Sequence, residues 1–222
     1  MEEHIVKILA SEYVTHDVKR FTVQKPEGYS FMAGQATEVS INKPEWRDQK
    51  RPFSFTSLNS WENLEFTIKI YREHAGVTNQ MEKLQEGDEL IIRDVWGAIT
   101  YKGPGFFIAG GAGITPFIAI LRQLKGDRKV KGNKLIFSNK TSADIILKDE
   151  FRKMLGSDFY IVLTRERVIG FIDKRIDEDY LKNTIKNFSQ HFYVCGPEAF
   201  VESIQAMLIN LGAKPDAVVI EK

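Results

Sequence analysis

The chain has 222 residues, of which 43% are hydrophobic, 27% charged and 11% aromatic. This composition excludes extensive disorder and leaves room for one large domain or for two of about 110 residues each. Cys195 is the only cysteine, which excludes an intrachain disulfide and a cysteine-ligated iron–sulfur cluster within these residues. We therefore expect no metal site here, and any metal cluster to belong to a partner.

Charge is distributed unevenly along the chain. The formal net charge is +1, which gives no overall signal for nucleic-acid binding. Residues 1–100 carry 12 Lys and Arg against 16 Asp and Glu, so residues 101–222 carry 19 against 14. The net charges of the two parts are thus −4 and +5. A basic second half suits phosphorylated ligands or an acidic partner, and a solvated charged surface explains it equally well.

The N-terminal segment has neither the basic region nor the apolar core of a signal peptide, because Met1 is followed by Glu2 and Glu3. No apolar run approaches the roughly 18 residues of a membrane-spanning helix. We therefore expect a cytoplasmic protein with neither a membrane nor a nucleic acid as its partner.

Up to about residue 95, apolar residues alternate with polar ones, which is typical of β-strands. Turn-forming segments rich in Pro, Gly and Asn separate six such runs, and only Val77–Gln85 has a helical pattern. Six strands at this spacing predict a small antiparallel β-barrel. The expected strands are Ile5–Val14, Arg20–Gln24, Thr37–Ile41, Phe53–Ser57, Leu64–Tyr71 and Glu89–Asp94.

After Gly105 the pattern changes to short apolar strands that alternate with helices, which predicts a parallel sheet with a nucleotide-binding crevice at the carboxyl ends of its strands. We place the domain boundary near residue 102, with a barrel over 1–102 and an α/β domain over 103–222. The expected strands are Phe106–Ala109, Lys134–Phe137, Phe159–Leu163, Phe192–Val194 and Ala217–Ile220. The expected helices are Pro116–Lys125, Lys148–Leu155, Asp177–Thr184 and Pro197–Leu211.

A glycine-rich turn at 110–113 follows the first strand of the α/β domain and precedes a helix. Glycines let the backbone approach a pyrophosphate, and a helix N-terminus offers unpaired N–H groups. Thr115 suits the N-cap and Pro116 the first helical position. The dinucleotide-binding fingerprint G-x-G-x-x-G is only half met, because Pro116 occupies its last position. A tight connection between strand and helix, without a ligand, explains the turn equally well.

Two further segments carry candidate site residues. Arg51–Ser54 offers a guanidinium for a phosphate, an aromatic ring for a flat ligand and a hydroxyl, although a core Phe with surface neighbours explains it as well. Cys195 ends a strand and is followed by a Gly-Pro turn, at the sheet edge where the glycine-rich turn is expected. A lone cysteine is more often a small buried hydrophobe, so its position rather than its type suggests a role.

Together these motifs resemble those of the ferredoxin/flavodoxin-NAD(P)H reductase superfamily. The resemblance extends over nearly the whole chain and rests on motifs in the same order and at similar separations. They are the Ala-Gly-Gln turn at 33–35, Arg51–Ser54, Gly76–Asn79, Gly110–Pro116 and Cys195–Glu198.

The resemblance implies an FAD-binding barrel followed by a nicotinamide-nucleotide domain. It assigns flavin contacts to Arg51, Pro52, Phe53, Ser54, Tyr71, Gly76, Val77 and Thr78, with Phe53 against the flavin ring and Ser54 near its N5 atom. It assigns nicotinamide-nucleotide contacts to Gly111, Gly113, Thr115, Gly196 and Pro197. It also places Cys195 beside the nicotinamide and matches Glu221 to an acidic residue near the family's C-terminus, which makes Ser54, Cys195 and Glu221 the catalytic candidates.

The implied activity is hydride transfer between a nicotinamide nucleotide and FAD, followed by single-electron transfer to a ferredoxin or flavodoxin. One alternative is reduction of free flavin or ferric chelates, or service as an oxygenase reductase component. Another is a non-catalytic nucleotide-binding subunit. For the coenzyme we expect a weak preference for NADPH over NADH, because Thr164 and Arg165 follow an apolar strand and resemble the Ser-Arg pair that binds the 2′-phosphate in plant-type members.

Overall fold

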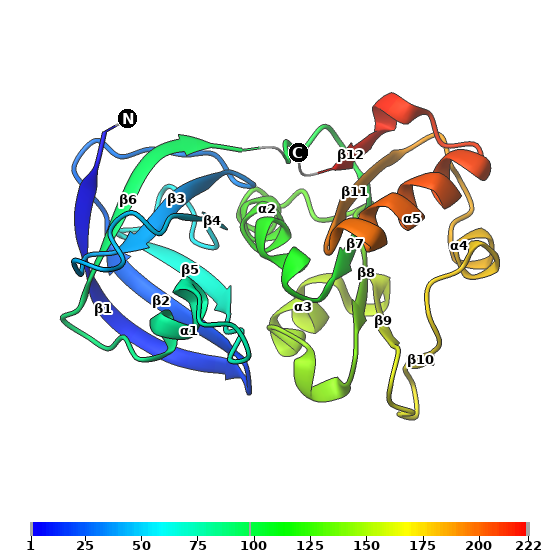
Figure 1. The fold of residues 1–222 in the computed structure, drawn as a ribbon. Helices are drawn as coiled ribbons and strands as arrows, with labels where there is room; N and C mark the ends of the chain where they lie inside the picture. Colours follow the sequence, from blue (N-terminus) through cyan, green and yellow to red (C-terminus); the bar gives the residue numbers. More distant parts are fainter. Residues whose placement is uncertain (1, 98, 221–222) are drawn as a thin grey trace. The chain divides into compact units, whose positions relative to one another are not determined.

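The computed structural model describes residues 2–97 and 99–220, which fold into two compact units (Figure 1). Residues 1–98 and 115–123 cluster in one, called here the barrel unit, and residues 99–114 and 124–222 in the other, the α/β unit. The domain boundary expected near residue 102 stays a prediction, because the chain passes between the units more than once.

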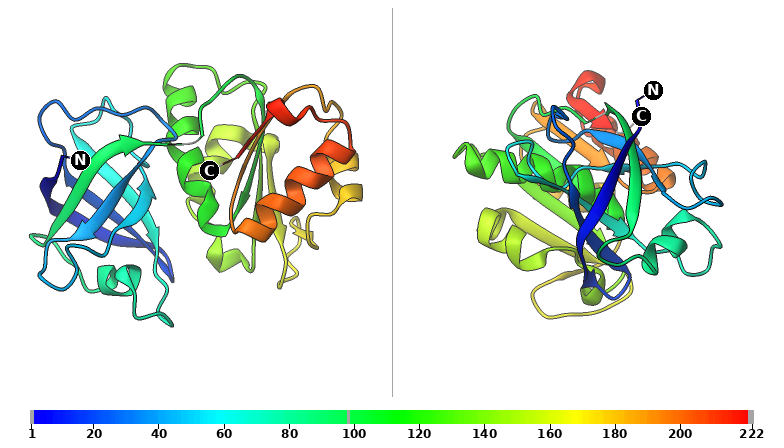
Figure 2. Two further views of the ribbon diagram at one scale, coloured as in Figure 1. Left: turned by 45° about the horizontal axis from the view of Figure 1, so that its top comes forward. Right: turned by 90° about the vertical axis from the view of Figure 1, so that its left-hand side faces the viewer.

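The barrel unit is built on six antiparallel strands in the order β4-β3-β6-β1-β2-β5. Figure 2 shows these strands from two further sides. An isolated antiparallel bridge between Phe55 and Phe66 joins the segment after β4 to β5, so the two edges of the sheet meet and close it. The elements are β1 (His4–Thr15), β2 (Val18–Gln24), β3 (Ala36–Ile41), β4 (Arg51–Ser54), β5 (Asn63–Lys69), α1 (Val77–Glu82) and β6 (Glu89–Trp96).

Alternation of side chains explains these strands. In β2, Phe21 and Val23 are completely buried, and they join Ile8 of β1 and Phe66 of β5 in one core. Each such side chain stabilises the fold by about 1.5–3 kcal/mol. The fourth strand begins two residues earlier than the sequence suggested, because exposed Arg51 and its neighbour still pair with β3 along an edge.

The α/β unit contains a parallel sheet in the order β10-β9-β8-β7-β11-β12. Its strands are β7 (Gly105–Gly110), β8 (Lys134–Asn139), β9 (Phe159–Leu163), β10 (Ile172–Asp173), β11 (His191–Cys195) and β12 (Val218–Ile220). Its helices are α3 (Lys148–Leu155), α4 (Glu178–Thr184) and α5 (Glu198–Asn210), and α2 (Thr115–Gly126) follows β7. The 3-10 helices are Gly111–Ile114, Ser142–Asp144, Gly156–Asp158 and Pro215–Ala217.

This strand order confirms the expected α/β fold and places the change of direction at β7. The chain moves from β7 to β8 and β9 on one side and returns to β11 on the other. Ligands of such sheets bind at the carboxyl ends of the strands at this switch point. The two-residue strand β10 was not expected, because two residues leave no periodic pattern to detect.

Across residues 2–97 and 99–220, no helix is long and apolar enough to cross a membrane.

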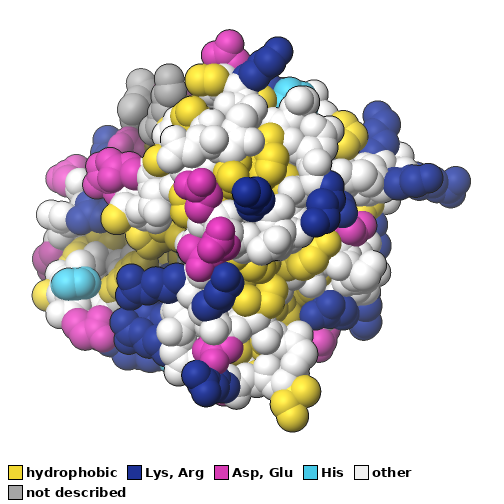
Figure 3. Space-filling view, turned by 90° about the vertical axis from the view of Figure 1, so that its right-hand side faces the viewer, with side chains coloured by type: hydrophobic (Ala, Val, Ile, Leu, Met, Phe, Trp, Pro, Cys, Tyr) yellow, Lys and Arg dark blue, Asp and Glu magenta, His cyan; other side chains and the backbone are white. Residues whose placement is uncertain are grey.

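On the face of the protein that Figure 3 shows, Lys and Arg side chains are interspersed with Asp and Glu. The basic excess of the second half therefore does not collect into one continuous patch on this face.

Candidate functional site

The glycine-rich turn lies at the centre of the parallel sheet. Strand β7 ends at Gly110, a 3-10 turn covers Gly111–Ile114, and α2 continues directly from Thr115. The expectation of Thr115 as N-cap with Pro116 as the first helical residue was therefore wrong, because the chain is already helical before Thr115. The glycines start the helical turn themselves.

Two glycines of this turn have different physical roles. Gly111 has φ +53°, which favours glycine, and a Cβ added there would meet no atom within 4 Å. A Cβ at Gly113 would lie 2.4 Å from the carbonyl oxygen of Cys195. Gly111 thus leaves open space beside the turn, whereas Gly113 allows close packing of the turn against the end of β11.

Cys195 is brought to the same edge of the sheet as the glycine turn. It ends β11 opposite Ala109 of β7 in parallel register, and it is 3% exposed. A Cβ at the following Gly196 would lie 2.8 Å from the Phe200 ring, and Pro197 occupies the N-cap position of α5. The structure therefore joins the Cys-Gly-Pro segment to the glycine turn, as the sequence led us to expect.

Thr164 and Arg165 lie at the carboxyl end of β9, which β8 separates from β7. Their N–H groups donate to the carbonyl oxygens of Asn139 and Lys140, each at 2.9 Å, so the bend after β9 is fixed to the end of β8. The Arg165 side chain is exposed. Together with the glycine turn and Cys195, these residues occupy one edge of one sheet.

Glu166 was not among the site residues that we predicted from the sequence. Its carboxylate accepts a hydrogen bond from the backbone N–H of Ser142, and this bond holds the pKa of Glu166 below its usual range. Only its place next to Arg165 could have drawn attention to it. Its negative charge thus follows directly after the positive charge of Arg165 in the chain.

Asn139, also missed, ends β8 between these groups and is 5% exposed. Among the described residues, neither polar atom of its side chain has a hydrogen-bond partner. Buried amides are normally satisfied, so an orphan at the edge where nucleotides bind is a notable exception. A polar residue closing an apolar strand was its only sequence signal.

In the barrel unit, β4 presents the Arg51–Ser54 motif along an edge of the six-stranded ladder. An edge position tolerates Pro52, which has no N–H to donate. Arg51 is exposed, Phe53 is half-buried against the core, and Ser54 is 8% exposed and pairs with Ala36. The guanidinium is thus accessible and the hydroxyl is sheltered.

The second barrel motif surrounds the start of α1. Gly76 precedes the helix, and a Cβ added there would meet nothing within 4 Å. Val77 is buried and anchors the turn, Thr78 is half-buried, and the Tyr71 ring is exposed near His74. Helix α1 contacts β3, the strand that pairs with β4. Both barrel motifs are therefore connected through β3. Glu221, the remaining candidate, lies outside the described residues.

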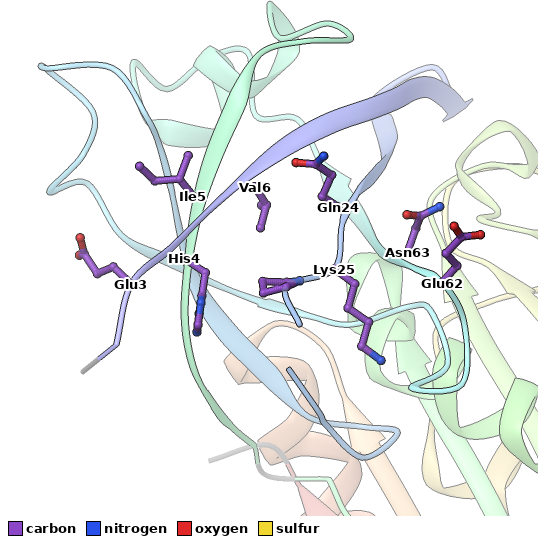
Figure 4. Close-up of a pocket in the computed structure, with 9 residues that line it drawn as sticks. Glu3, His4, Ile5, Val6, Gln24, Lys25, Glu62 and Asn63 are labelled. Carbon is purple, nitrogen blue, oxygen red and sulfur yellow. The ribbon is translucent and has the colours of Figure 1, made fainter. Parts of the chain in front are cut away.

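An open pocket of about 630 Å³ lies elsewhere on the barrel unit (Figure 4). It opens between the start of β1 and the segments around Lys25 and Asn63, and its lining includes Glu3 and Glu62. None of the residues selected from the sequence lines it. Carboxylates on its wall do not suit a pyrophosphate, so we do not assign it to a nucleotide.

Comparison with known families decides the identity of the two halves. Residues 6–101 match the family model of the oxidoreductase FAD-binding domain, and residues 107–206 match that of the oxidoreductase NAD-binding domain. The chain belongs to the ferredoxin/flavodoxin-NAD(P)H reductase superfamily. This reductase-family chain therefore combines an FAD-binding domain with a nicotinamide-nucleotide-binding domain.

Curated relatives of the reductase are distant. NADH-cytochrome b5 reductase 2 of Mycosarcoma maydis is 26% identical over 211 residues, which cover 85% of this chain and 60% of that protein. NADH-cytochrome b5 reductase 1 of Arabidopsis thaliana is 25% identical, with 95% and 80% covered. The reductase component of the naphthalene 1,2-dioxygenase system of Pseudomonas putida is 24% identical, with 94% and 65% covered. The chain thus spans less than two thirds of some relatives.

Solved structures support the fold. A ferredoxin NADP+ reductase from Neisseria gonorrhoeae with bound FAD and NADP superimposes with a TM-score of 0.86 at 21% identity, covering 99% of this chain and 98% of that one. The cytochrome P450 reductase GcoB of Amycolatopsis gives 0.87 at 19% identity, covering 100% and 69%.

The residues present fit both nucleotides on physical grounds. On the barrel unit, Gly76 leaves room for a ligand, and Arg51 offers an exposed guanidinium that donates to the Lys50 carbonyl at 2.7 Å. On the α/β unit, Gly111 leaves open space beside its turn, and the orphaned amide of Asn139 lies at the same edge. Each unit therefore carries room for a phosphate-bearing ligand together with polar groups suited to it.

Proposed function

We propose that this chain transfers a hydride between NAD(P)H and FAD and passes single electrons to a ferredoxin or flavodoxin. The observation that carries the proposal is the meeting of Cys195 with the glycine turn at one sheet edge, in a chain that also has an FAD-binding domain. A binding module would have no need of a thiol at that edge together with a sheltered hydroxyl in the flavin motif.

The barrel unit supplies the flavin contacts in this proposal. Arg51 pairs with a flavin phosphate, Phe53 covers the flavin ring beside Pro52, and Ser54 offers its hydroxyl near the N5 atom. The backbone of Gly76, Val77 and Thr78 binds the pyrophosphate, and Tyr71 lies against the adenine.

The glycine turn, the start of α2 and the end of β11 supply the nicotinamide-nucleotide contacts in this proposal. Gly111 and Thr115 bind the pyrophosphate, while Gly113 keeps the turn against β11. Gly196 and Pro197 shape the floor beside Cys195, whose thiol lies next to the reacting carbon of the nicotinamide. Glu221 is the third catalytic candidate.

Bound FAD supplies the chemistry that converts a two-electron donor into a source of single electrons. The chain's own residues align the reacting groups and exclude water, which is the main contribution of protein to such transfers. Cys195, almost fully buried, keeps the nicotinamide face dry. Ser54 holds a hydrogen bond where charge changes during transfer.

The first experiment identifies the flavin and tests the two reaction residues. Denaturing the purified protein should release FAD, and release of FMN would contradict the pyrophosphate contacts. Stopped-flow reduction by NADPH should slow in Cys195→Ala and in Ser54→Ala while both keep their flavin. Parent-like rates would return both residues to structural roles, and a colourless protein that binds nucleotides would favour the non-catalytic alternative.

The acceptor is tested by comparing candidates on one preparation. Ferredoxin or flavodoxin should be reduced faster than free flavin or ferric chelates. Some relatives are named as cytochrome b5 reductases or oxygenase reductase components, so electron transfer to cytochrome b5 or to an oxygenase component is the second candidate function. Faster reduction of cytochrome b5 or of an oxygenase component would replace the ferredoxin proposal with that one.

For the coenzyme we propose a preference for NADPH through Thr164 and Arg165. Lys174 contributes little, because its ammonium lies 3.0 Å from the Asp177 carboxylate. Arg165→Ala should raise the KM for NADPH about 10-fold or more and leave that for NADH nearly unchanged, since a charge-assisted bond contributes about 1.5–3 kcal/mol. Arg175→Ala is the matched control. Equal effects on both coenzymes, or a parent faster with NADH, would exclude the preference.

A further inference from the structure

A buried lysine fixes one end of α1 to the barrel. Lys19 of β2 is 7% exposed, and its ammonium donates to the carbonyl oxygens of Glu82 at 3.0 Å and Leu84 at 2.6 Å. A buried charge is costly unless hydrogen-bonded, and burial lowers the pKa of Lys19. The fold thus commits a costly group to holding the end of one short helix.

Glu82 connects the same helix end to the segment that precedes α1. Its carboxylate lies 2.8 Å from the Arg72 guanidinium and 2.9 Å from the Tyr13 hydroxyl. Arg72 also donates to the carbonyl of His16 at 3.1 Å, and its own carbonyl accepts from the Asn79 side chain at 3.0 Å. The segment before α1 is therefore tied to the helix and to the β1–β2 hairpin.

Lys19, Tyr13, Arg72 and Glu82 form what we call the α1 anchor. Through Arg72 it holds residues 71–78, the segment that also carries Tyr71, Gly76, Val77 and Thr78. A helix of six residues is marginal on its own, so these polar contacts add to the burial of Val77 and Met81 in ordering the segment. None of the four anchor residues belongs to the proposed flavin contacts.

We propose that the α1 anchor is a set of positioning residues that pre-orders residues 71–78 for the AMP half of FAD. This rests on the proposed function, which assigns the flavin pyrophosphate to that segment. Ordering a loop at the moment of binding costs affinity, and a loop held in advance avoids that cost. The anchor therefore determines how long FAD is retained, without touching it.

The test compares Lys19→Met with Lys69→Met in the full chain. Lys69 is the comparison residue, since it is also a lysine of the barrel sheet but its ammonium pairs at 2.8 Å with the Asp17 carboxylate rather than with the carbonyl groups at the end of α1. Lys19→Met should release FAD at least 10-fold faster by flavin fluorescence, and amide hydrogen exchange over 71–78 should speed up in the apoprotein. Lys69→Met should change neither.

Three outcomes separate the anchor from the function on which it rests. If Thr78→Ala weakens FAD binding while Lys19→Met leaves retention and exchange unchanged, the anchor proposal is overturned and the flavin site stands. If Thr78→Ala and Gly76→Val also leave FAD binding unchanged, the proposed location of the pyrophosphate fails first. Where Lys19→Met does not fold, Arg72→Met breaks the same network from the exposed side and should give the same two changes.

Discussion

The two units stabilise their candidate sites by different means. Of the eleven described residues that are polar or charged and buried, nine lie in the barrel unit and two in the α/β unit. The buried charged residues, Lys19, Glu65 and Arg93, all lie in the barrel unit, whereas the two buried polar residues of the α/β unit, Asn133 and Asn139, are uncharged. The barrel is therefore specified by networks of charged side chains, and the α/β unit by apolar strands with close backbone contacts at glycine.

This difference shows where each site is sensitive. In the barrel unit the site residues range from exposed Arg51 to buried Val77, and the buried ammonium of Lys19 holds the end of α1 through backbone carbonyls. In the α/β unit the glycines themselves bring two strand ends together, with no side chain between them. Breaking charges should thus damage the first unit, and adding a methyl group should damage the second.

The largest expected effect is at Glu65 in the barrel unit. Its carboxylate lies 2.6 Å from Arg122 and accepts from Thr56 at 2.7 Å, and it is 8% exposed. Glu65→Leu should destabilise the protein by about 3–5 kcal/mol, because it leaves the Arg122 charge buried beside an apolar group. Urea unfolding measures this change.

The double variant of Glu65→Leu with Arg122→Met serves as the control. Replacing both members of a buried pair by apolar groups is often nearly neutral, so most of the lost stability should return. A double variant as unstable as Glu65→Leu alone would show that packing, rather than charge burial, explains the loss.

The next effect is at Gly113 in the α/β unit. Gly113→Ala places a Cβ against backbone atoms of β11 and should cost about 1–3 kcal/mol while raising the KM for the nicotinamide nucleotide. Gly126→Ala is the control, since it has no neighbour within 4 Å and a helical glycine loses about 0.5–1 kcal/mol against alanine. If both variants had the same stability, close packing would not be the reason for Gly113.

Two buried asparagines test the α/β unit from the opposite direction. The Asn133 side chain accepts from the Tyr101 hydroxyl at 3.2 Å and donates to the Lys129 carbonyl at 3.1 Å. The amide of the Asn139 side chain, by contrast, has no hydrogen-bond partner among the described residues. Asn139→Leu should raise the free energy of unfolding by about 1–2 kcal/mol, and Asn133→Leu should lower it by a similar amount. Thermal unfolding of the two variants without nucleotide measures these changes. If both variants were less stable than the parent, an internal water would satisfy the Asn139 side chain.

The fold was largely predictable because its signals are local. Alternation identified the barrel strands, and strand–helix alternation identified the parallel sheet. Segments without such a signal were missed, such as β10, which has two residues. The start of β4 was missed because exposed Arg51 and Pro52 look like turn residues, although an edge strand accepts them.

The candidate site was only partly predictable, because its supporting groups are joined by long-range contacts. Gly113 was selected for a ligand, yet in the fold it packs against the backbone of Cys195, more than eighty positions away. Lys19 looked like an ordinary polar residue of a strand, and only the folded chain places it under the end of α1. Periodicity carries no information on such partners.

The smallest expected effect compares one carboxylate from each unit. Glu3 lies 2.7 Å from the buried guanidinium of Arg93, and this hydrogen bond lowers the pKa of Glu3. The backbone N–H of Ser142 lowers the pKa of Glu166. Both contribute stability above the usual glutamate pKa, near 4.5, and both contributions disappear as the pH falls through the lower pKa of the folded state.

Salt should separate the two carboxylates. Glu3 is attracted by a full charge, so raising the ionic strength should move its pKa back toward the usual value, whereas a neutral N–H on Glu166 is screened much less. Titration of the two carboxyl carbons by NMR at low and high salt measures both shifts. An equal response would mean that the charge of Arg93 is not what lowers the pKa of Glu3, and that the two units do not differ in this respect.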